Sequence, residues 1–252
     1  MGRLLNKPKR LCEDHYLIGI DMGSDVSSPG QFVNIRLTHQ TDPLLRRPFS
    51  IHNHEKNTIE VVFRVVGKGT KILRNLNKGT EIDVLAPLGK GFSIITNGRA
   101  LLIGGGVGNA PLYYLAKKLK EQNTHVSYIY GARSKNYVYL KKRYTSVSDL
   151  FILSTDDGSE GRRGLVPDIT NDIIHRNNFD YIYICGPSIM MEKTLDLLND
   201  ILIPIEISVE NYFGCGIGLC YGCAVEGING MKRACIDGPV FNSREIHLAS
   251  IK

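Results

Sequence analysis

Four cysteines near the carboxyl end of the chain limit most strongly what it can fold into. They follow the spacing C-x4-C-x2-C-x11-C and are Cys215, Cys220, Cys223 and Cys235. This is the spacing of plant-type [2Fe–2S] ligands, in which four thiolates hold two bridged irons. Such a centre needs a loop that bends tightly and brings backbone N–H groups close to sulfur. Glycines at positions 214, 216, 218 and 222 meet that need.

Two other uses of these cysteines stay open at this point. A structural zinc site usually pairs its thiols as two C-x2-4-C units, whereas Cys235 stands alone. Disulfides are disfavoured because three cysteines within nine residues cannot all pair with one another, and no secretory signal precedes them. The spacing therefore favours iron–sulfur over zinc, and zinc over disulfides. Cys12 and Cys185 are isolated, and we expect both to stay reduced.

Composition narrows the class of protein. The 252 residues are 42% hydrophobic and 22% charged, enough for two compact domains and a small appendage. No stretch of about 18 apolar residues occurs and the first ten residues lack an apolar signal core, so we expect no membrane segment and a cytoplasmic location. The formal charge of +6 does not predict nucleic-acid binding, because Lys and Arg are scattered and no RNA-binding signature accompanies them.

The pattern of apolar residues changes near residue 97. Before it, β-rich stretches at 31–37, 59–66 and 81–86 are separated by turn residues and predict an antiparallel Greek-key β-barrel. After it, apolar strands alternate with helices, which predicts a parallel α/β sheet with helices on both faces. The expected strands are 100–103, 126–130, 151–154 and 181–185, and the expected helices are 109–121 and 188–201. We expect residues 205–209 to close this α/β domain, and we divide the chain into domains 1–97, 98–209 and 210–252.

A glycine-rich turn in the second domain predicts a dinucleotide site. It follows an apolar strand and opens a helix, where free N–H groups and the helix dipole favour a phosphate. The turn holds Gly104, Gly105, Gly106 and Gly108. It lacks the G-x-G-x-x-G fingerprint, so simple close packing of strand and helix is an alternative. A second segment at the carboxyl end of a later strand favours the nucleotide, and its residues are Cys185, Gly186 and Pro187.

Two segments of the first domain have the groups that bind a flavin. Residues 46–51 supply a guanidinium, an aromatic face and a hydroxyl, which suit the phosphates, the ring plane and the ring nitrogens. Residues 64–70 then form a glycine turn that enters a short helix at Thr70, a further anion site. Each segment alone is better explained as an ordinary barrel strand or turn. Their combination favours the flavin.

In order along the chain, these motifs resemble one family. They read Arg-Pro-x-Ser-Ile, Gly-x-Gly-Thr, Gly-Gly-Gly-x-Gly-x-Ala-Pro-Leu, Cys-Gly-Pro, Cys-Gly-Ile-Gly-x-Cys-Tyr-x-Cys, and the run at 234–241. Over nearly its whole length the chain resembles the electron-transfer subunits of bacterial dihydroorotate dehydrogenase type B. The wider group of ferredoxin-reductase-like flavoproteins shares the first four motifs. The cysteine loop with Tyr221 and the Asp-Gly-Pro-Val-Phe run after Cys235 are the discriminating parts.

The resemblance implies an oxidoreductase subunit that binds FAD, NAD and one [2Fe–2S] cluster through the four cysteines. The residues implied to contact FAD are Arg47, Pro48, Phe49, Ser50, Arg64, Val65, Val66, Gly69 and Thr70. Many relatives in the wider group carry tyrosine where Phe49 stands, so contacts through that hydroxyl are missing here. The implied partner is an FMN-containing catalytic subunit that oxidises dihydroorotate in pyrimidine (UMP) synthesis, with electrons passing through the cluster and FAD to NAD⁺. A heterotetramer with two chains of each kind is implied as well.

Two other functions stay open. One is a diaphorase or electron-transfer subunit of an NADH-dependent ferredoxin:NADP reductase or a hydrogenase, although glycine is usual there in place of Tyr221. The other is a regulatory module that binds zinc and only senses nucleotides. No nucleophile with its base is apparent, so we expect no catalytic residue of the orotate chemistry in this chain. His52 and His54 share a strand face without a third ligand nearby, and we expect them to be solvated or hydrogen-bonded.

Overall fold

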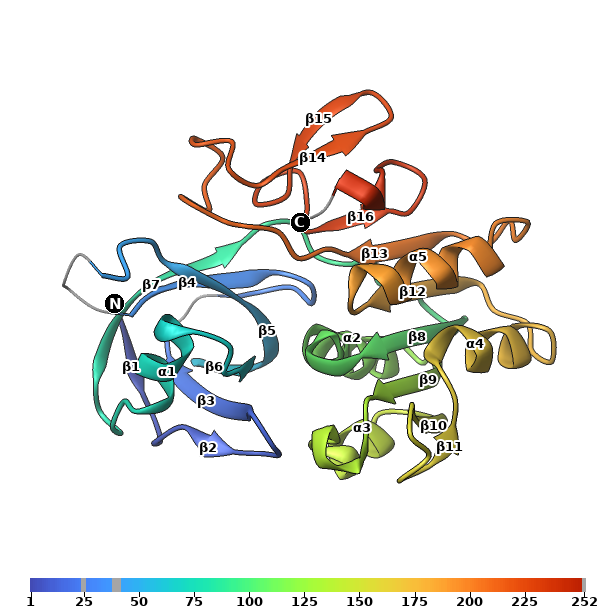
Figure 1. The fold of residues 1–252 in the computed structure, drawn as a ribbon, viewed down its shortest axis with the longest axis horizontal. Helices are drawn as coiled ribbons and strands as arrows, with labels where there is room; N and C mark the ends of the chain where they lie inside the picture. The colour runs from blue at the N-terminus through green and yellow to red at the C-terminus, as the bar shows by residue number, and fades with distance from the viewer. Residues whose placement is uncertain (24–25, 38–41, 251–252) are drawn as a thin grey trace.

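The computed structural model describes residues 1–23, 26–37 and 42–250. A closed β-barrel lies beside a layered α/β sheet, and the C-terminal segment runs across the top of both (Figure 1). None of the helices in these ranges is long and apolar enough to cross a membrane. The expected order of a barrel followed by an α/β sheet is confirmed.

The barrel is antiparallel, with strand order β1-β7-β4-β5-β6-β3-β2 and a β1–β3 pairing that closes it. Strands β4, β5 and β6 form a meander and β7 returns beside β4, which is the Greek-key arrangement. The strand bounds are β1 Gly2–Leu4, β2 Lys9–Arg10, β3 His15–Asp21, β4 Phe32–Arg36, β5 Arg47–Glu55, β6 Thr58–Arg64 and β7 Glu81–Leu88, and a short helix, α1 Lys68–Arg74, precedes β7. Inward side chains such as Ile18, Ile20 and Val61 are fully buried and form the barrel core.

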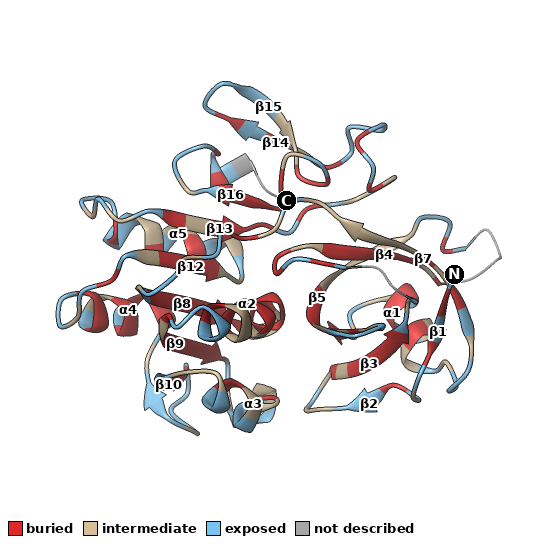
Figure 2. Cartoon of the chain, turned by 180° about the vertical axis from the view of Figure 1, so that it is seen from behind, coloured by how far each residue is buried: buried red, intermediate tan, exposed pale blue. Residues whose placement is uncertain are grey.

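The second sheet is parallel over most of its width, in the order β11-β10-β9-β8-β12-β13-β16. Its bounds are β8 Arg99–Gly105, β9 His125–Ala132, β10 Leu150–Thr155, β11 Arg162–Arg163, β12 Tyr181–Cys185 and β13 Ile205–Ser208. Strands β8 and β9 are buried along their lengths (Figure 2), as expected for strands covered on both faces.

Helices cover both faces of this sheet, as expected. They are α2 Asn109–Glu121, α3 Lys141–Ser146, α4 Val166–Ile174 and α5 Ser188–Leu197. Alternate residues of β8 separate the two layers: Leu101 and Ile103 pack with α4 and α5, while Ala100 and Leu102 pack with α2 and α3. The expected bounds of α2 are confirmed, whereas α5 ends four residues before the expected 201.

Residues Ile205–Ser208 form β13, within the segment expected to close the α/β domain, and the sheet continues one strand beyond it. Strand β16, Val240–Asn242, pairs antiparallel with β13 and takes the outer position. The cysteine-bearing segment also contributes a hairpin of β14, Ala224–Gly227, and β15, Gly230–Arg233. Most of its buried apolar residues, among them Cys235 and Phe241, belong to the same apolar cluster as Ile207 of β13. An exposed sheet edge is a liability, and here the end of the chain covers it.

The barrel and the α/β sheet meet where helix α2 packs against β5. Tyr114 of α2 is buried in the barrel core, and its hydroxyl donates to the carbonyl of Ser27 over 2.9 Å. Lys117 of the same helix forms an ion pair with Glu55 at the end of β5. The helix that opens at the glycine-rich turn is thus part of both units.

Phe241 tests how far the C-terminal segment depends on the sheet. The ring is 3% exposed, and replacing it by alanine should lower the free energy of unfolding by about 3–5 kcal/mol because a buried cavity results. Urea unfolding followed by circular dichroism measures this. Leu202→Ala is the control, because Leu202 is 88% exposed and should change stability by no more than ~0.5 kcal/mol. Equal losses in the two variants would contradict the packing described.

Candidate functional site

The cysteine loop directs its backbone N–H groups toward sulfur. Cys215 Sγ accepts N–H groups from Ile217, Leu219 and Cys220 over 3.3–3.5 Å. Burial acts to raise the pKa of Cys215, but these donors outweigh it and lower the pKa to about 6. Cys235 Sγ accepts the N–H of Gly218 over 3.2 Å. The loop therefore stabilises thiolate at Cys215, the ionic form that binds iron.

The four thiols lie as two contacting pairs. Cys215 and Cys220 form one pair, with the Cys215 N–H donating to Cys220 Sγ over 3.4 Å. Cys223 and Cys235 form the other, and burial together with the adjacent Cys223 thiol raises the pKa of Cys235 to about 12. Among the described residues, no three His, Cys, Asp or Glu side chains are grouped so as to hold a metal ion. Two pairs of thiols suit two irons, each with two sulfur ligands, better than one tetrahedral zinc.

The loop is held in shape by backbone conformations and by one arginine. Gly216 and Gly218 have φ of 77° and 81°, and Tyr221 is a non-glycine residue at φ 58°. The Arg233 guanidinium lies 5.3 Å from the centre of the Tyr221 ring and donates to the carbonyl of Gly218 over 3.1 Å. The strain at Tyr221 is thus offset by a cation–π contact.

An asparagine of the barrel, missed by the sequence analysis, anchors the loop. Asn34 of β4 is fully buried, and its Nδ2 donates to the carbonyl of Cys215 over 3.3 Å. A Cβ on Gly216 would lie 2.5 Å from the same Nδ2, so the loop approaches the barrel closely there. Asn34 is the register partner of Pro48 on β5. The only local signal was a polar residue in an otherwise apolar strand.

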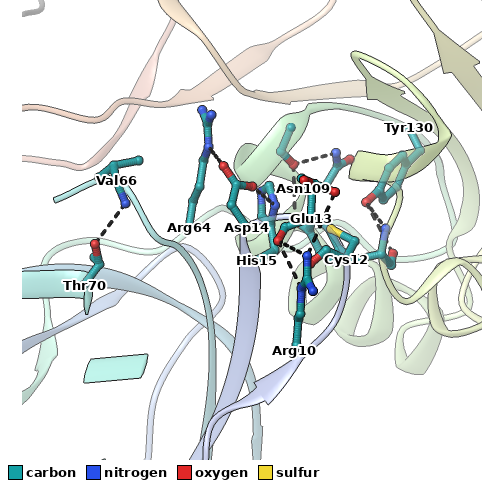
Figure 3. A network of polar contacts seen from close by, with 12 residues as sticks. Arg10, Cys12, Glu13, Asp14, His15, Arg64, Val66, Thr70, Asn109 and Tyr130 are labelled. Carbon is teal, nitrogen blue, oxygen red and sulfur yellow. Dashed lines mark hydrogen bonds and ion pairs between the residues drawn. The ribbon is translucent and has the colours of Figure 1, made fainter. Parts of the chain in front are cut away.

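The predicted FAD residues gather along β5 and at the start of α1. Arg47 lies over the turn, since a Cβ on Gly69 would be 3.4 Å from its Nε. Thr70 Oγ accepts the N–H of Val66 over 3.0 Å, a contact visible in Figure 3. Pro48, Phe49 and Ser50 follow Arg47 on β5 and are half-buried, while Arg64 and Val65 lead from β6 into the turn. The two segments thus form one partly open surface, the arrangement that an extended cofactor requires.

Arg64 already has a protein partner. Its Nε donates to Asp14 Oδ2 over 2.7 Å, and the other carboxylate oxygen of Asp14 lies 2.9 Å from His15 Nδ1 (Figure 3). The guanidinium is still about half exposed, with 46% of the side chain accessible. Arg64 can therefore hold a cofactor group only while oriented by Asp14.

The two predicted nucleotide segments come together. Gly104 and Cys185 are register partners on the neighbouring strands β8 and β12. A Cβ on Gly108 would lie 2.6 Å from the Cys185 carbonyl oxygen and from Gly186, the residue before Pro187. Three turn glycines are explained by close packing alone, and they are Gly104, Gly105 and Gly108. Gly106 faces open space at φ 55° and is the turn residue left free to approach a ligand.

His52 and His54 were expected to be either solvated or hydrogen-bonded, and both are hydrogen-bonded. His52 is fully buried, and its Nδ1 lies 2.9 Å from the carbonyl oxygen of Ala110. His54 Nδ1 accepts the N–H of Ser27 over 3.2 Å. The alternative of a solvated side chain is wrong for His52.

Gly108→Ala tests the nucleotide turn. The added Cβ would meet backbone atoms, which cannot rotate away, so the turn must shift. We expect NADH binding to weaken by about tenfold or more, at the lower end of the ~1–3 kcal/mol cost of overpacking. Titration of the purified protein with NADH measures this. Gly79→Ala is the control, because Gly79 lies in the barrel, where φ is 83° and a Cβ would meet nothing within 4 Å, and it should leave NADH binding unchanged.

Cys235→Ala tests the ligand set. With one of four thiolates missing, the anaerobically purified protein should lose the visible iron–sulfur absorbance and contain less than half of the wild-type iron and acid-labile sulfide. Cys12→Ala should keep both, because Cys12 lies outside the loop. A colourless wild-type protein that contains zinc would overturn the iron–sulfur assignment.

Comparisons with known proteins agree with this geometry. Residues 210–247 match the iron–sulfur cluster binding domain of dihydroorotate dehydrogenase B, and residues 102–196 match an oxidoreductase NAD-binding domain. The chain is 38% identical over 225 residues to the dihydroorotate dehydrogenase B (NAD(+)) electron transfer subunit of Desulforamulus reducens, covering 86% of each. It is 36% identical over 250 residues to the subunit of the same name from Fusobacterium nucleatum, covering 95% of each.

Solved structures give the same picture. One chain in the structure of the NADH-dependent reduced ferredoxin–NADP oxidoreductase superposes with a TM-score of 0.90 at 33% identity, covering 99% of this chain and 91% of that one. The ferredoxin reductase of carbazole 1,9a-dioxygenase, at 20% identity and a TM-score of 0.68, covers 82% of this chain and 67% of its own and shares the fold. The resemblance inferred from the motifs is thereby confirmed. The chain belongs to the family of dihydroorotate dehydrogenase B electron transfer subunits.

Proposed function

We propose that this chain carries electrons between NAD⁺ and a separate FMN-containing subunit that oxidises dihydroorotate to orotate. The observation that carries the proposal is the pairing of four thiols in a loop anchored on the barrel beside the flavin segment. The match of this loop to the cluster domain of dihydroorotate dehydrogenase B supports it. The six cysteines are unpaired, which suits a reducing cytoplasm.

The residues present fit the three groups that the family implies. Cys215, Cys220, Cys223 and Cys235 would hold a [2Fe–2S] centre. Arg47, Pro48, Phe49, Ser50, Arg64, Val65, Val66, Gly69 and Thr70 would hold FAD, and Gly104, Gly105, Gly106, Gly108, Cys185, Gly186 and Pro187 would bound the NAD site. When bound, FAD accepts electrons as a hydride or singly, which allows exchange with both NAD and an iron–sulfur centre. The protein's part is to hold the three sites close together.

The surface of the cysteine module is suited to a protein partner. Large apolar side chains are exposed around the loop: Leu219 at 77%, Tyr212 at 72% and Tyr221 at 60%. Exposed apolar groups that cluster beside a site mark protein interfaces. Cys220 is exposed as well, so a partner that covers the loop would shield the centre from solvent and shorten the path for electrons. We propose that the FMN subunit binds here, in a heterotetramer of two chains of each kind.

Leu219→Asp tests this docking surface. A charge at the centre of an apolar interface should weaken binding of the catalytic subunit by about 30-fold, the effect of losing a hot spot worth ~2 kcal/mol. Co-purification and dihydroorotate-dependent NADH formation measure the loss, while iron and flavin content should stay at wild-type values. Leu202→Asp is the control, since Leu202 is exposed on the sheet domain. If the wild-type chain oxidises dihydroorotate without a second protein, the proposal that a separate subunit carries out this oxidation is wrong.

The solved structure at 33% identity supports a second function, electron transfer in an NADH-dependent reduced ferredoxin–NADP oxidoreductase. The cluster-domain match and the relatives at up to 38% identity favour the dihydroorotate assignment. Co-purification from the native cell distinguishes the two. Recovery of an FMN protein with dihydroorotate activity supports our proposal, and recovery of a ferredoxin-dependent NADP reductase contradicts it.

A further inference from the structure

We propose that two histidines of the barrel, His52 and His15, are positioning residues that set the glycine-rich turn against the flavin strand. The inference rests on the proposed function, because it assigns to these side chains the relative placement of the nicotinamide and flavin sites. Neither histidine belongs to a predicted cofactor-binding segment. Each one joins a strand beside or within the predicted flavin site to the turn or to the helix that it opens.

His52 makes the first link. It lies on β5 two residues after Ser50, and its Nδ1 is 2.9 Å from the carbonyl oxygen of Ala110. Ala110 is the second residue of α2, directly after the turn. A carbonyl only accepts hydrogen bonds, so Nδ1 must donate and carries the proton. The strand that would hold the flavin is thus bonded to the helix that opens at the nucleotide turn.

The surroundings of His52 keep it in this state. The ring stacks on Tyr113 with centroids 4.7 Å apart, and the side chain is fully buried. Burial lowers the pKa of His52 to about 4, against smaller opposing effects of the Ala110 hydrogen bond and of Glu60. The ring is therefore neutral near pH 7 and holds one tautomer. Its Nε2 is buried without a hydrogen-bond partner among the described residues, so the Nδ1 contact is what orients the ring.

His15 makes the second link. His15 of β3 is the register partner of Arg64 of β6. The residue before it, Asp14, accepts a hydrogen bond from the Arg64 guanidinium (Figure 3). The His15 ring stacks on Tyr139 of the α/β unit, with centroids 5.1 Å apart and an interplanar angle of 25°. The Tyr139 hydroxyl donates to the carbonyl oxygen of Gly106 over 3.3 Å. A predicted flavin contact and the free glycine of the turn are therefore joined through three side chains.

The Gly106 carbonyl is held from two directions. Asn109 Nδ2 donates to it over 2.9 Å, in addition to Tyr139. With this carbonyl bound and φ at 55°, the peptide after Gly106 cannot rotate freely. The two links therefore act on the same few residues of the turn, one at Gly106 and one at Ala110. Because a misplacement of about 1 Å can slow a reaction roughly 100-fold, such links matter for hydride transfer more than for affinity.

Three substitutions at His52 separate positioning from packing. Leucine removes the donor but fills the space. Asparagine places an amide N–H where Nδ1 stands, and glutamine places it where Nε2 stands. We expect flavin reduction by NADH, followed by stopped flow, to slow at least tenfold in His52→Leu and His52→Gln. His52→Asn should retain the rate within threefold. The dissociation constant for NADH should change less than threefold in all three variants.

A second measurement does not depend on turnover. Hydrogen–deuterium exchange at residues 106–110 should be faster in His52→Leu and close to wild type in His52→Asn. Tyr139→Phe keeps the ring under His15 and removes the hydroxyl that bonds to Gly106 and to Tyr144, so it should also raise exchange at the turn and remain folded. His175→Leu, at an exposed histidine of the α/β unit, is the matched control and should leave rate and exchange unchanged.

The outcomes distinguish this inference from the proposed function. If wild-type protein binds no FAD or is not reduced by NADH, the proposed function fails. If wild type is reduced normally and His52→Leu matches it in rate and exchange, the positioning role is wrong. Equal losses in His52→Leu and His52→Asn would mean that the hydrogen bond from Nδ1 to Ala110 is not what the imidazole contributes, which also overturns the inference.

Discussion

The packing of helix α2 against strand β5 is the contact on which the arrangement of the whole chain depends. Strand β5 begins with the segment Arg47 to Ser50, and α2 begins at the glycine-rich turn. One side of the contact thus presents flavin-binding groups and the other presents nucleotide-binding groups. Tyr114 contributes apolar packing to the contact, because its ring enters the barrel core. His52 adds a directional hydrogen bond to the carbonyl oxygen of Ala110. Apolar packing alone would allow the two units to slide, whereas a buried hydrogen bond specifies one register.

The C-terminal segment joins the same assembly at two places. Strand β16 adds to the edge of the α/β sheet, and Asn34 of the barrel binds the cysteine loop. Phe213, just before the first cysteine, stacks on Phe32 of the barrel with centroids 4.9 Å apart and an interplanar angle of 8°. Contacts to both larger units leave the loop little freedom to move away from them. The distance between an iron–sulfur centre and a flavin would therefore be set by the fold and not by a flexible linker.

Tyrosines beneath the nucleotide turn illustrate how polar groups are used in this core. Tyr128, Tyr130 and Tyr139 are buried, and burial raises the pKa of each well above its usual value. They therefore remain neutral and serve as hydrogen-bond donors, with Tyr144 donating to the carbonyl oxygen of Asn109 over 3.1 Å. Their rings supply apolar area while their hydroxyls satisfy backbone carbonyls that a close-packed glycine turn leaves open. The tyrosines therefore support the turn by packing and by hydrogen bonds together.

Local patterns in the sequence determined the parts of this protein. Cysteine spacing predicted the ligand set, alternation of apolar residues predicted a barrel and an α/β sheet, and the bounds of α2 were predicted to the residue. The tertiary structure alone decided how the parts meet. Asn34 and Cys215 are 181 residues apart and His52 and Ala110 are 58 apart, so no local pattern marks either pair. Residue periodicity reports which face of an element is buried. Which element packs on that face depends on how distant parts of the chain come together. The position of β16 at the outer edge of the sheet was missed for this reason.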